Sequence, residues 1–205
     1  MRIQIEGNGS FGSFLKELLK DQFEIVDNAE SVILAVPLSA YESVARENTN
    51  KHLVNVCSVQ KPSTDICWRF GSVVTSIHPL FGRRTPASKR FSILTHIGLD
   101  NDTWESGMEC QKEFLEGFKK VSTIYEHEDF QTGKRFTPES HDLLMLKTHV
   151  AAVLAAKQLQ IYIDRAQNIP DHLIPNSFRL MRDFVRTLDD MPQGTIESIM
   201  ANPYL

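Results

Sequence analysis

The feature that most constrains the fold is a glycine motif close to the amino terminus. Residues 7–12 read Gly-Asn-Gly-Ser-Phe-Gly, directly after a weakly alternating segment at 2–6 and before apolar residues at helical spacing up to Leu19. A strand, a tight turn and a helix are therefore predicted in that order. Because the turn leaves free N–H groups at the start of a helix, it is suited to hold a phosphate group.

Short apolar segments and helical segments then alternate along the chain. Strands are predicted at residues 2–6, 23–26, 31–38, 52–56, 73–77, 92–95 and 121–125, and further helices at 39–47, 62–70 and 103–119. The run SVILAVPL at 31–38 is typical of a strand that is buried on both faces of a parallel sheet. The alternation predicts a doubly wound α/β sheet, with residues 1–135 as a Rossmann-like domain that binds a dinucleotide.

The pattern becomes helical after Gly133, and no further strand is predicted there. Thr137-Pro138-Glu139-Ser140 resembles a helix start, and residues 143–163 form an apolar stretch that needs cover on most sides. Residues 136–205 are too few to bury such a helix alone. We therefore predict a smaller all-helical domain that forms a homodimer by packing against a second copy of itself.

Composition and charge make several classes of partner unfavourable. A formal net charge of −4 and a pI near 6.0 give no attraction to nucleic acid or to anionic membranes. No export signal is visible in MRIQIEGNGSFG, and polar residues interrupt the apolar stretch at 143–163. The odd number of cysteines and their spacing favour reduced thiols over a metal site or disulfides; these are Cys57, Cys67 and Cys110. A cytoplasmic protein is expected.

The glycine motif predicts the residues that hold NAD or NADP. Its three glycines permit a tight turn, close approach of a pyrophosphate, and packing of the helix on the strand. Asp27 lies 20 residues after Gly7, where an acid at a strand end would bind a ribose hydroxyl and favour NAD. A solvated turn aspartate is an equally good interpretation, because the following segment is short. The residues expected at the cofactor are Gly7, Asn8, Gly9, Ser10, Phe11, Gly12, Asp27, Val36 and Pro37.

Two polar residues follow other predicted strands, at the edge where open α/β sheets bind ligands. Ser58 follows the strand at 52–56 and His78 follows the strand at 73–77. A histidine can accept a hydroxyl proton while a hydride leaves the same carbon, as an alcohol oxidation requires. His78 is thus a candidate catalytic base and Ser58 its partner. A structural histidine in a His-Pro turn and a loop hydroxyl are the alternatives.

At this point the sequence resembles the prephenate and arogenate dehydrogenases of tyrosine biosynthesis. The shared segments are GNGSFG at 7–12, ILAVPLS at 33–39, NVCSVQKP at 55–62, IHPLFG at 77–82 and TPESHDLLM at 137–145. The resemblance implies an NAD(P)-dependent oxidative decarboxylation of prephenate or arogenate. It also implies that His78 hydrogen-bonds the ring hydroxyl of the substrate and that Ser58 assists it.

The resemblance also implies a cationic partner for the substrate carboxylates. The segment FRLMRDFVR at 178–186 matches the neighbourhood of the family's arginine, which makes Arg186 the first candidate and Arg179 the second. An exposed helix face is the alternative for both. His141, followed by Asp142, matches the family's His-Asp pair and is the third candidate substrate contact, although a helix-cap neighbour is an alternative.

Several departures from the family pattern leave other functions open. The chain is short, its second strand-helix unit is trimmed, and the lysine of the serine motif is displaced by Gln60 to Lys61. Furthermore, His149 does not align with the family's second helix histidine, and Arg83-Arg84 follow HPLFG. Another short Rossmann reductase, such as an F420-dependent NADP reductase, and a dinucleotide-binding module without catalysis are the alternatives.

Overall fold

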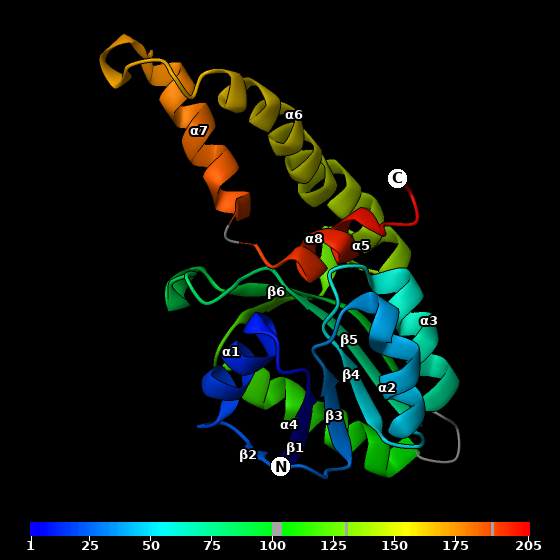
Figure 1. The fold of residues 1–205 in the computed structure, drawn as a ribbon. Helices are drawn as coiled ribbons and strands as arrows, with labels where there is room; N and C mark the ends of the chain where they lie inside the picture. The colour runs from blue at the N-terminus through cyan, green and yellow to red at the C-terminus, as the bar shows by residue number, and fades with distance from the viewer. Residues whose placement is uncertain (100–103, 130, 190) are drawn as a thin grey trace.

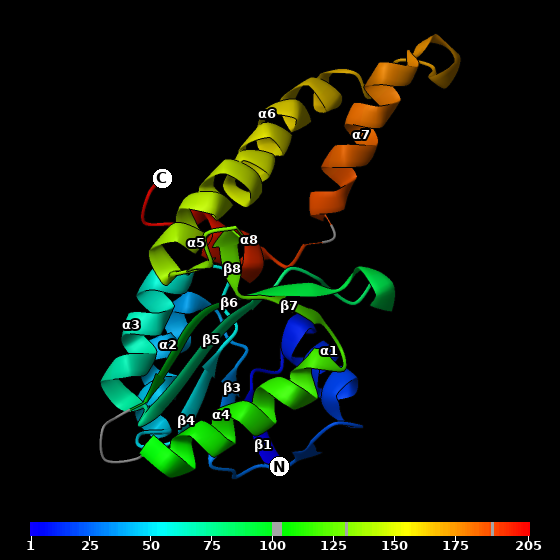
Figure 2. The ribbon, with the colours of Figure 1, turned by 180° about the vertical axis from the view of Figure 1, so that it is seen from behind.

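The computed structural model describes residues 1–99, 104–129, 131–189 and 191–205. An α/β body contains the amino-terminal part of the chain, and a helical hairpin extends from it as an arm (Figure 1). The view from behind shows that this arm leaves the body at one end of the sheet (Figure 2).

The body is built on a seven-stranded sheet of order β2-β1-β3-β4-β5-β6-β7. Neighbouring strands are parallel from β2 through β5, β6 runs antiparallel to β5, and β7 runs parallel to β6. The strands are β1 (Arg2–Glu6), β2 (Glu24–Ile25), β3 (Ser31–Leu34), β4 (His52–Asn55), β5 (Val73–Pro79), β6 (Phe91–Leu99) and β7 (Thr123–Tyr125). The predicted α/β fold with a mostly parallel sheet is confirmed.

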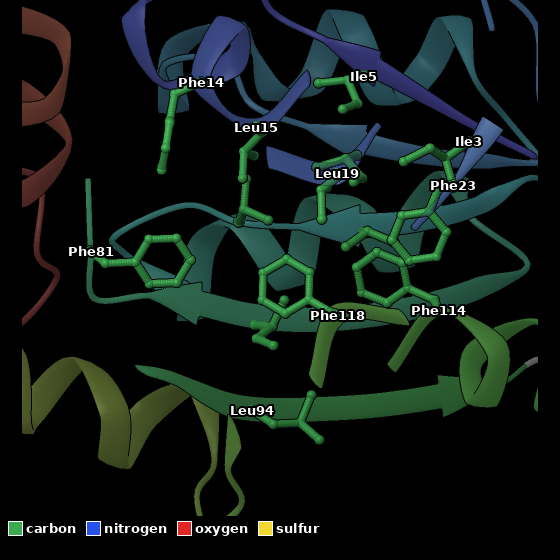
Figure 3. Packing of buried hydrophobic residues seen from close by; sticks show 14 residues of the cluster. Ile3, Ile5, Phe14, Leu15, Leu19, Phe23, Phe81, Leu94, Phe114 and Phe118 are labelled. Carbon is green, nitrogen blue, oxygen red and sulfur yellow. The ribbon is translucent and has the colours of Figure 1, made fainter. Parts of the chain in front are cut away.

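Helices cover the two faces of this sheet. The helices α1 (Ser10–Leu19) and α4 (Trp104–Lys119) pack on one face, and the short η1 (Leu38–Ala40), α2 (Tyr41–Glu47) and α3 (Gln60–Phe70) on the other. On the first face Phe23 and Phe114 stack with ring centroids 5.8 Å apart, next to Phe118 (Figure 3). Aromatic rings that are buried in this way contribute much of the hydrophobic stabilisation of a core.

One edge of the sheet is less covered, because the segment 26–30 joins β2 to β3 without a helix. Ile3 and Ile5 of β1 belong to the core cluster with α1 and α4, while Gln4 and Glu6 line a hollow that Lys16 of α1 also lines. This agrees with the trimmed second unit seen in the sequence. It leaves open space beside the glycine motif.

The chain differs from the sequence-based expectation after Gly133, because one more strand is present. The strands β8 (His127–Asp129) and β9 (Lys134–Arg135) form a small antiparallel hairpin. The expectation of no strand after Gly133 is therefore wrong, since a two-residue strand has too few positions to show a period. Helices follow, beginning with α5 (Pro138–Met145), whose capping box joins Thr137 and Ser140.

The predicted helix at 143–163 is divided into three parts. After α5 come the π-helix η4 (Leu146–Val150) and α6 (Ala151–Arg165), then η5 (Asp171–Leu173), α7 (Asn176–Asp189) and α8 (Gln193–Met200). The helices α6 and α7 form the arm, whereas α8 returns to the body beside α5 (Figures 1 and 2). Ile199 of α8 packs on Val150 and Val153.

The arm leaves much apolar surface uncovered. Leu154, Ile161, Tyr162 and Leu180 are between 44% and 62% exposed. Large exposed apolar side chains that gather on one face mark interaction sites. Within the described ranges, no helix has both the length and the apolar character that a bilayer crossing would need.

Several predicted boundaries shift in the structure. The third strand ends at Leu34 instead of residue 38, and β6 is longer than the predicted 92–95. The helix predicted from residue 103 begins at Trp104, and Thr103 lies outside the described residues. The three cysteines are free thiols, and two of them, Cys57 and Cys67, are buried.

Candidate active site

The glycine motif lies between β1 and α1, and its three glycines meet different surroundings. Gly7 has a φ of +121°, and a Cβ on it would lie 2.2 Å from the carbonyl oxygen of Ala35. A Cβ on Gly12 would lie 2.2 Å from the carbonyl oxygen of Gly7. Among the described atoms, none lies within 4 Å of a Cβ built on Gly9. The fold itself thus requires glycine at Gly7 and Gly12, whereas Gly9 leaves free space at the start of α1.

A surface hollow of about 360 Å³ adjoins this turn and includes Asp27. Gly7, Asn8, Lys16 and Asp27 are among the residues that line it. The side-chain amide oxygen of Asn8 accepts a hydrogen bond of 2.9 Å from Lys16 Nζ. The structure therefore brings Asp27 and the glycine turn to one hollow, which is where a ribose next to a bound pyrophosphate would lie.

The other residues predicted at the cofactor surround the same end of the sheet. Ser10 begins α1, and Phe11 packs beside Phe14 with ring centroids 6.1 Å apart. Val36 joins the core beneath α2. Pro37 is exposed and lies near the start of α8, where a Cβ on Gly194 would lie 3.4 Å from Pro37 Cγ.

His78 lies at the carboxyl end of β5 and is only 3% exposed. Its Nδ1 lies 2.9 Å from Nε2 of His141, whose own Nδ1 lies 2.9 Å from Oδ1 of Asp142. The carboxylate of Asp142 accepts hydrogen bonds of 2.8 Å from the backbone N–H groups of Gln60 and Lys61. A chain of hydrogen bonds therefore joins β5, α5 and the start of α3.

His141 is fully buried, and both of its ring nitrogens are engaged by protein atoms. In this structure neither ring nitrogen of His141 is left for a ligand, and the contact of His141 with a substrate stays a prediction. The pattern placed His141 near the site, but the sequence could not show which groups its ring would meet.

The electrostatic surroundings favour a neutral His78. Burial lowers its pKa well below the ordinary value, and His141 and His149 lower it further. The ring of His149 lies with its centroid 5.6 Å from that of His78. Burial, followed by the influence of His141, lowers the pKa of His149 as well. Neutral imidazoles can accept a proton, which is what a general base needs.

His149 is a residue to which the sequence pattern gave no role. His149 lies in the π-helix η4, whose turn is wider than that of an α-helix. The wide turn brings His149, eight positions after His141, closer to the same helix face. Its Nδ1 is buried and has no hydrogen-bond partner in the part of the chain that the structure describes. A wide turn has no clear sequence signature, so this placement could not be predicted.

Ser58 is half-buried in the segment between β4 and α3. The strands β4 and β5 are neighbours in parallel register, with Asn55 opposite Ser76. Ser58 therefore follows β4, and His78 lies at the carboxyl end of the adjacent β5, so both are at the same edge of the sheet. The displaced lysine points elsewhere, because Lys61 Nζ pairs with Asp65, while Gln60 is buried and accepts a hydrogen bond of 2.7 Å from Thr95.

The candidate arginines are on the arm, and α7 lies away from the sheet (Figure 1). Arg179 donates a hydrogen bond of 2.8 Å to the carbonyl oxygen of Asp171, and Arg186 is 63% exposed with Asp183 3.8 Å away. The structure of the single chain therefore does not bring them to His78. The intervening Arg182 is less exposed, and its Nε is buried without a partner among the described residues.

Comparison with known proteins adds information on the fold. No protein-family model and no curated protein matches the sequence. A candidate prephenate dehydrogenase from Corynebacterium glutamicum is similar in structure, with a TM-score of 0.66 and 16% identity over 97% of this chain and 74% of that chain. Synechocystis arogenate dehydrogenase gives a TM-score of 0.55 and 15% identity over 98% of this chain and 87% of that one.

A more distant neighbour widens this set. The reductive aminase from Aspergillus terreus, solved with NADPH, gives a TM-score of 0.53 and 9% identity over 92% of this chain and 73% of that chain. At such identities the likeness concerns the fold. The chain thus has the fold of Rossmann-type oxidoreductases, and its structural neighbours include a candidate prephenate dehydrogenase and an arogenate dehydrogenase.

Proposed function

We propose that this protein is an NAD(P)-dependent dehydrogenase that oxidises and decarboxylates prephenate or arogenate. The observation that carries the proposal is the buried His78 at the carboxyl end of β5, whose Nδ1 is held by His141. Among the described residues, no group hydrogen-bonds its Nε2, so this atom is available to a substrate hydroxyl. Ligands of open α/β sheets bind at this edge.

The glycine turn fits a dinucleotide, because the space beside Gly9 is what a closely approaching pyrophosphate would need. The N–H groups at the start of α1 would bind its oxygens. When bound, the nicotinamide supplies the acceptor for a hydride. Asp27 in the adjoining hollow would bind the ribose hydroxyls of NAD and repel the 2′-phosphate of NADP, so NAD is the favoured cofactor.

In the proposed reaction, the residues of the chain orient the substrate and move one proton. His78 Nε2 accepts the proton of the ring hydroxyl while the carbon that bears this hydroxyl gives up its hydride. Ser58 orients the hydroxyl. The ring carboxylate then leaves as carbon dioxide and the ring becomes aromatic. General base catalysis of this kind contributes roughly 10²–10⁴-fold to a rate.

The proposed homodimer and the proposed carboxylate contacts belong together. The arm exposes Leu154 and Ile161, and its α7 carries Arg179 and Arg186 away from the sheet of its own chain. A role for these arginines in substrate binding therefore requires α7 of a second copy near the carboxyl edge. Replacement of Leu154 and Ile161 by Glu should give monomers by light scattering and raise KM for the substrate. Dimers of unchanged KM would contradict this part of the proposal.

The experiment that tests the function is a pair of assays on His78→Asn. Turnover with prephenate or arogenate should fall by at least about 10²-fold, because the proton acceptor is lost. The dissociation constant of NAD should stay within a factor of about two, since His78 is not placed at the glycine turn. Unchanged turnover in His78→Asn would overturn the proposed mechanism.

The same assays distinguish two other functions from the proposed one. An F420-dependent NADP reductase would turn over reduced F420 and would not depend on His78. A dinucleotide-binding module would bind NAD and show no turnover with any of these substrates.

A further inference from the structure

We propose that Asp142 and His141 are positioning residues that fix His78 as the tautomer with a free acceptor at Nε2. The hydrogen-bond chain from the start of α3 through α5 to β5 sets this direction. The consequence for catalysis rests on the proposed function, whereas the tautomer itself can be measured without a substrate.

The donor-to-acceptor direction of this hydrogen-bond chain is set first by the carboxylate of Asp142. This side chain is fully buried, and each of its oxygens accepts a backbone N–H from the first turn of α3, Gln60 on Oδ1 and Lys61 on Oδ2. The positive end of a helix dipole favours a negative group at this point. A carboxylate acts only as an acceptor, so the contact of 2.9 Å with His141 requires a proton on His141 Nδ1.

The next step carries this direction to His78. When His141 is neutral and carries its proton on Nδ1, its Nε2 has a lone pair. His141 Nε2 therefore accepts at the contact of 2.9 Å, and Nδ1 of His78 must donate. The remaining nitrogen of a neutral His78 is then a lone-pair acceptor. The other ring neighbour, His149, contacts His78 by its ring face or edge, and no hydrogen bond joins the two rings in the described structure.

This arrangement matches the need of the proposed reaction. A base that removes a hydroxyl proton must present a lone pair and not an N–H group. When His78 gains a proton at Nε2, its Nδ1–H remains bonded to His141, and the Asp142 carboxylate at the end of the chain stabilises the positive charge. In enzymes, the hydrogen bond that one ring nitrogen of a histidine makes commonly sets the protonation of the other nitrogen.

The same carboxylate also positions Ser58. Ser58 lies two residues before Gln60, whose N–H is bound to Asp142. The carbonyl oxygen of Asp142 accepts a further hydrogen bond of 2.8 Å from the side chain of Asn202. Asp142 thus ties α3, α5 and the carboxyl-terminal segment together at the point where both proposed catalytic side chains lie.

The test is ¹⁵N NMR of the histidine rings in the protein without ligands, at neutral pH. The expected result for His78 is a protonated Nδ1 and an unprotonated Nε2. In His141→Phe, which keeps the contacts of Asp142 with α3, His78 should lose this preference and populate both tautomers. In the matched variant His149→Gln, the preference should stay, because His149 makes no hydrogen bond to His78. A protonated Nε2 in the unmodified protein would overturn the proposal, as would an unchanged tautomer in His141→Phe.

Kinetics give a second readout. In His141→Phe we expect kcat to fall by about 10²-fold, with the dissociation constant of NAD and the KM of the substrate nearly unchanged. Asp142→Asn should lower kcat further, because it also loosens the start of α3. An unchanged kcat in His141→Phe would show that the hydrogen-bond chain from Asp142 to His78 has no role in catalysis. If the unmodified protein turns over neither substrate but the NMR result holds, the proposed function fails and the positioning inference stands.

Discussion

Two buried histidines lie at opposite ends of the sheet, and each is 3% exposed. His52 begins β4, and its two ring nitrogens lie 3.0 Å from Ser31 Oγ and 2.9 Å from Thr75 Oγ1. His78 ends β5, where one nitrogen contacts His141 and the other has no hydrogen-bond partner among the described residues. Burial lowers the pKa of both, that of His52 to about 3.

The comparison shows that burial and a lowered pKa do not by themselves distinguish a structural histidine from the proposed catalytic one. The hydroxyl groups around His52 can adapt as donor or acceptor, so they impose no tautomer. The carboxylate behind His78 imposes one. A free nitrogen of fixed character, at the edge where such sheets bind ligands, is what separates the second histidine from the first.

The largest expected effects come from making the same substitution, histidine to asparagine, at the two ends of the sheet. His78→Asn should lower kcat by about 10²-fold or more at little cost in stability. His52→Asn should leave kcat within a factor of about three and destabilise the fold by about 2 kcal/mol, because buried hydroxyl partners lose hydrogen bonds. Urea unfolding and steady-state assays on both variants measure this. Similar kinetic losses in both would remove the distinction.

A second contrast concerns two glycines of the same turn. Gly12→Ala should destabilise the protein by about 1–3 kcal/mol, because the new methyl group would meet the carbonyl oxygen of Gly7. Gly9→Ala should leave the unfolding free energy within about 0.5 kcal/mol, but weaken NAD binding by roughly tenfold, since the methyl group fills the space meant for the pyrophosphate. Calorimetric titration and thermal unfolding separate the two effects. Equal NAD affinity in Gly9→Ala and the unmodified protein would argue against this binding mode.

The unfolding free energy should depend on pH. Because the folded state keeps His52 and His78 neutral, the unfolded chain takes up more protons below the ordinary histidine pKa of about 6.5. The unfolding free energy should therefore fall as the pH drops below about 6.5, by about 1.4 kcal/mol per pH unit for each such histidine. Above this pH the contribution is fully present.

The pH effect can be assigned with the His52→Asn variant. Between about pH 5 and 6, its stability should depend on pH less steeply than that of the unmodified protein, by the share of one histidine. Urea unfolding at several pH values measures both slopes. Identical slopes would mean that His52 is not kept neutral by its burial.

The sequence predicted those features that depend on local spacing. The strand, turn and helix around Gly7, the apolar strand after Ser31, and the positions of Ser58 and His78 after neighbouring strands follow from periodicity and from the rule that parallel strands end at one edge. The antiparallel direction of β6 did not follow, because strand direction depends on the path of the chain between strands. Its short, turn-rich connection to β5 fits an antiparallel pair.

The features that depend on distant contacts could not be predicted. The bond from Asp142 to the start of α3 joins residues 82 positions apart in the chain. The wide turn that brings His149 to His78, and the extension of α6 and α7 away from the body, are set by packing and not by local pattern. The contact of His141 with His78 could not be predicted for the same reason, since these two residues are 63 positions apart in the chain.

The most direct test of the proposed function is the formation of NADH or NADPH by the purified protein. NAD and NADP are each offered with prephenate and with arogenate, and carbon dioxide is measured in parallel. We expect turnover with NAD and at least one of the two substrates, with one carbon dioxide released for each NADH formed. Binding of NAD without turnover of either substrate would contradict it.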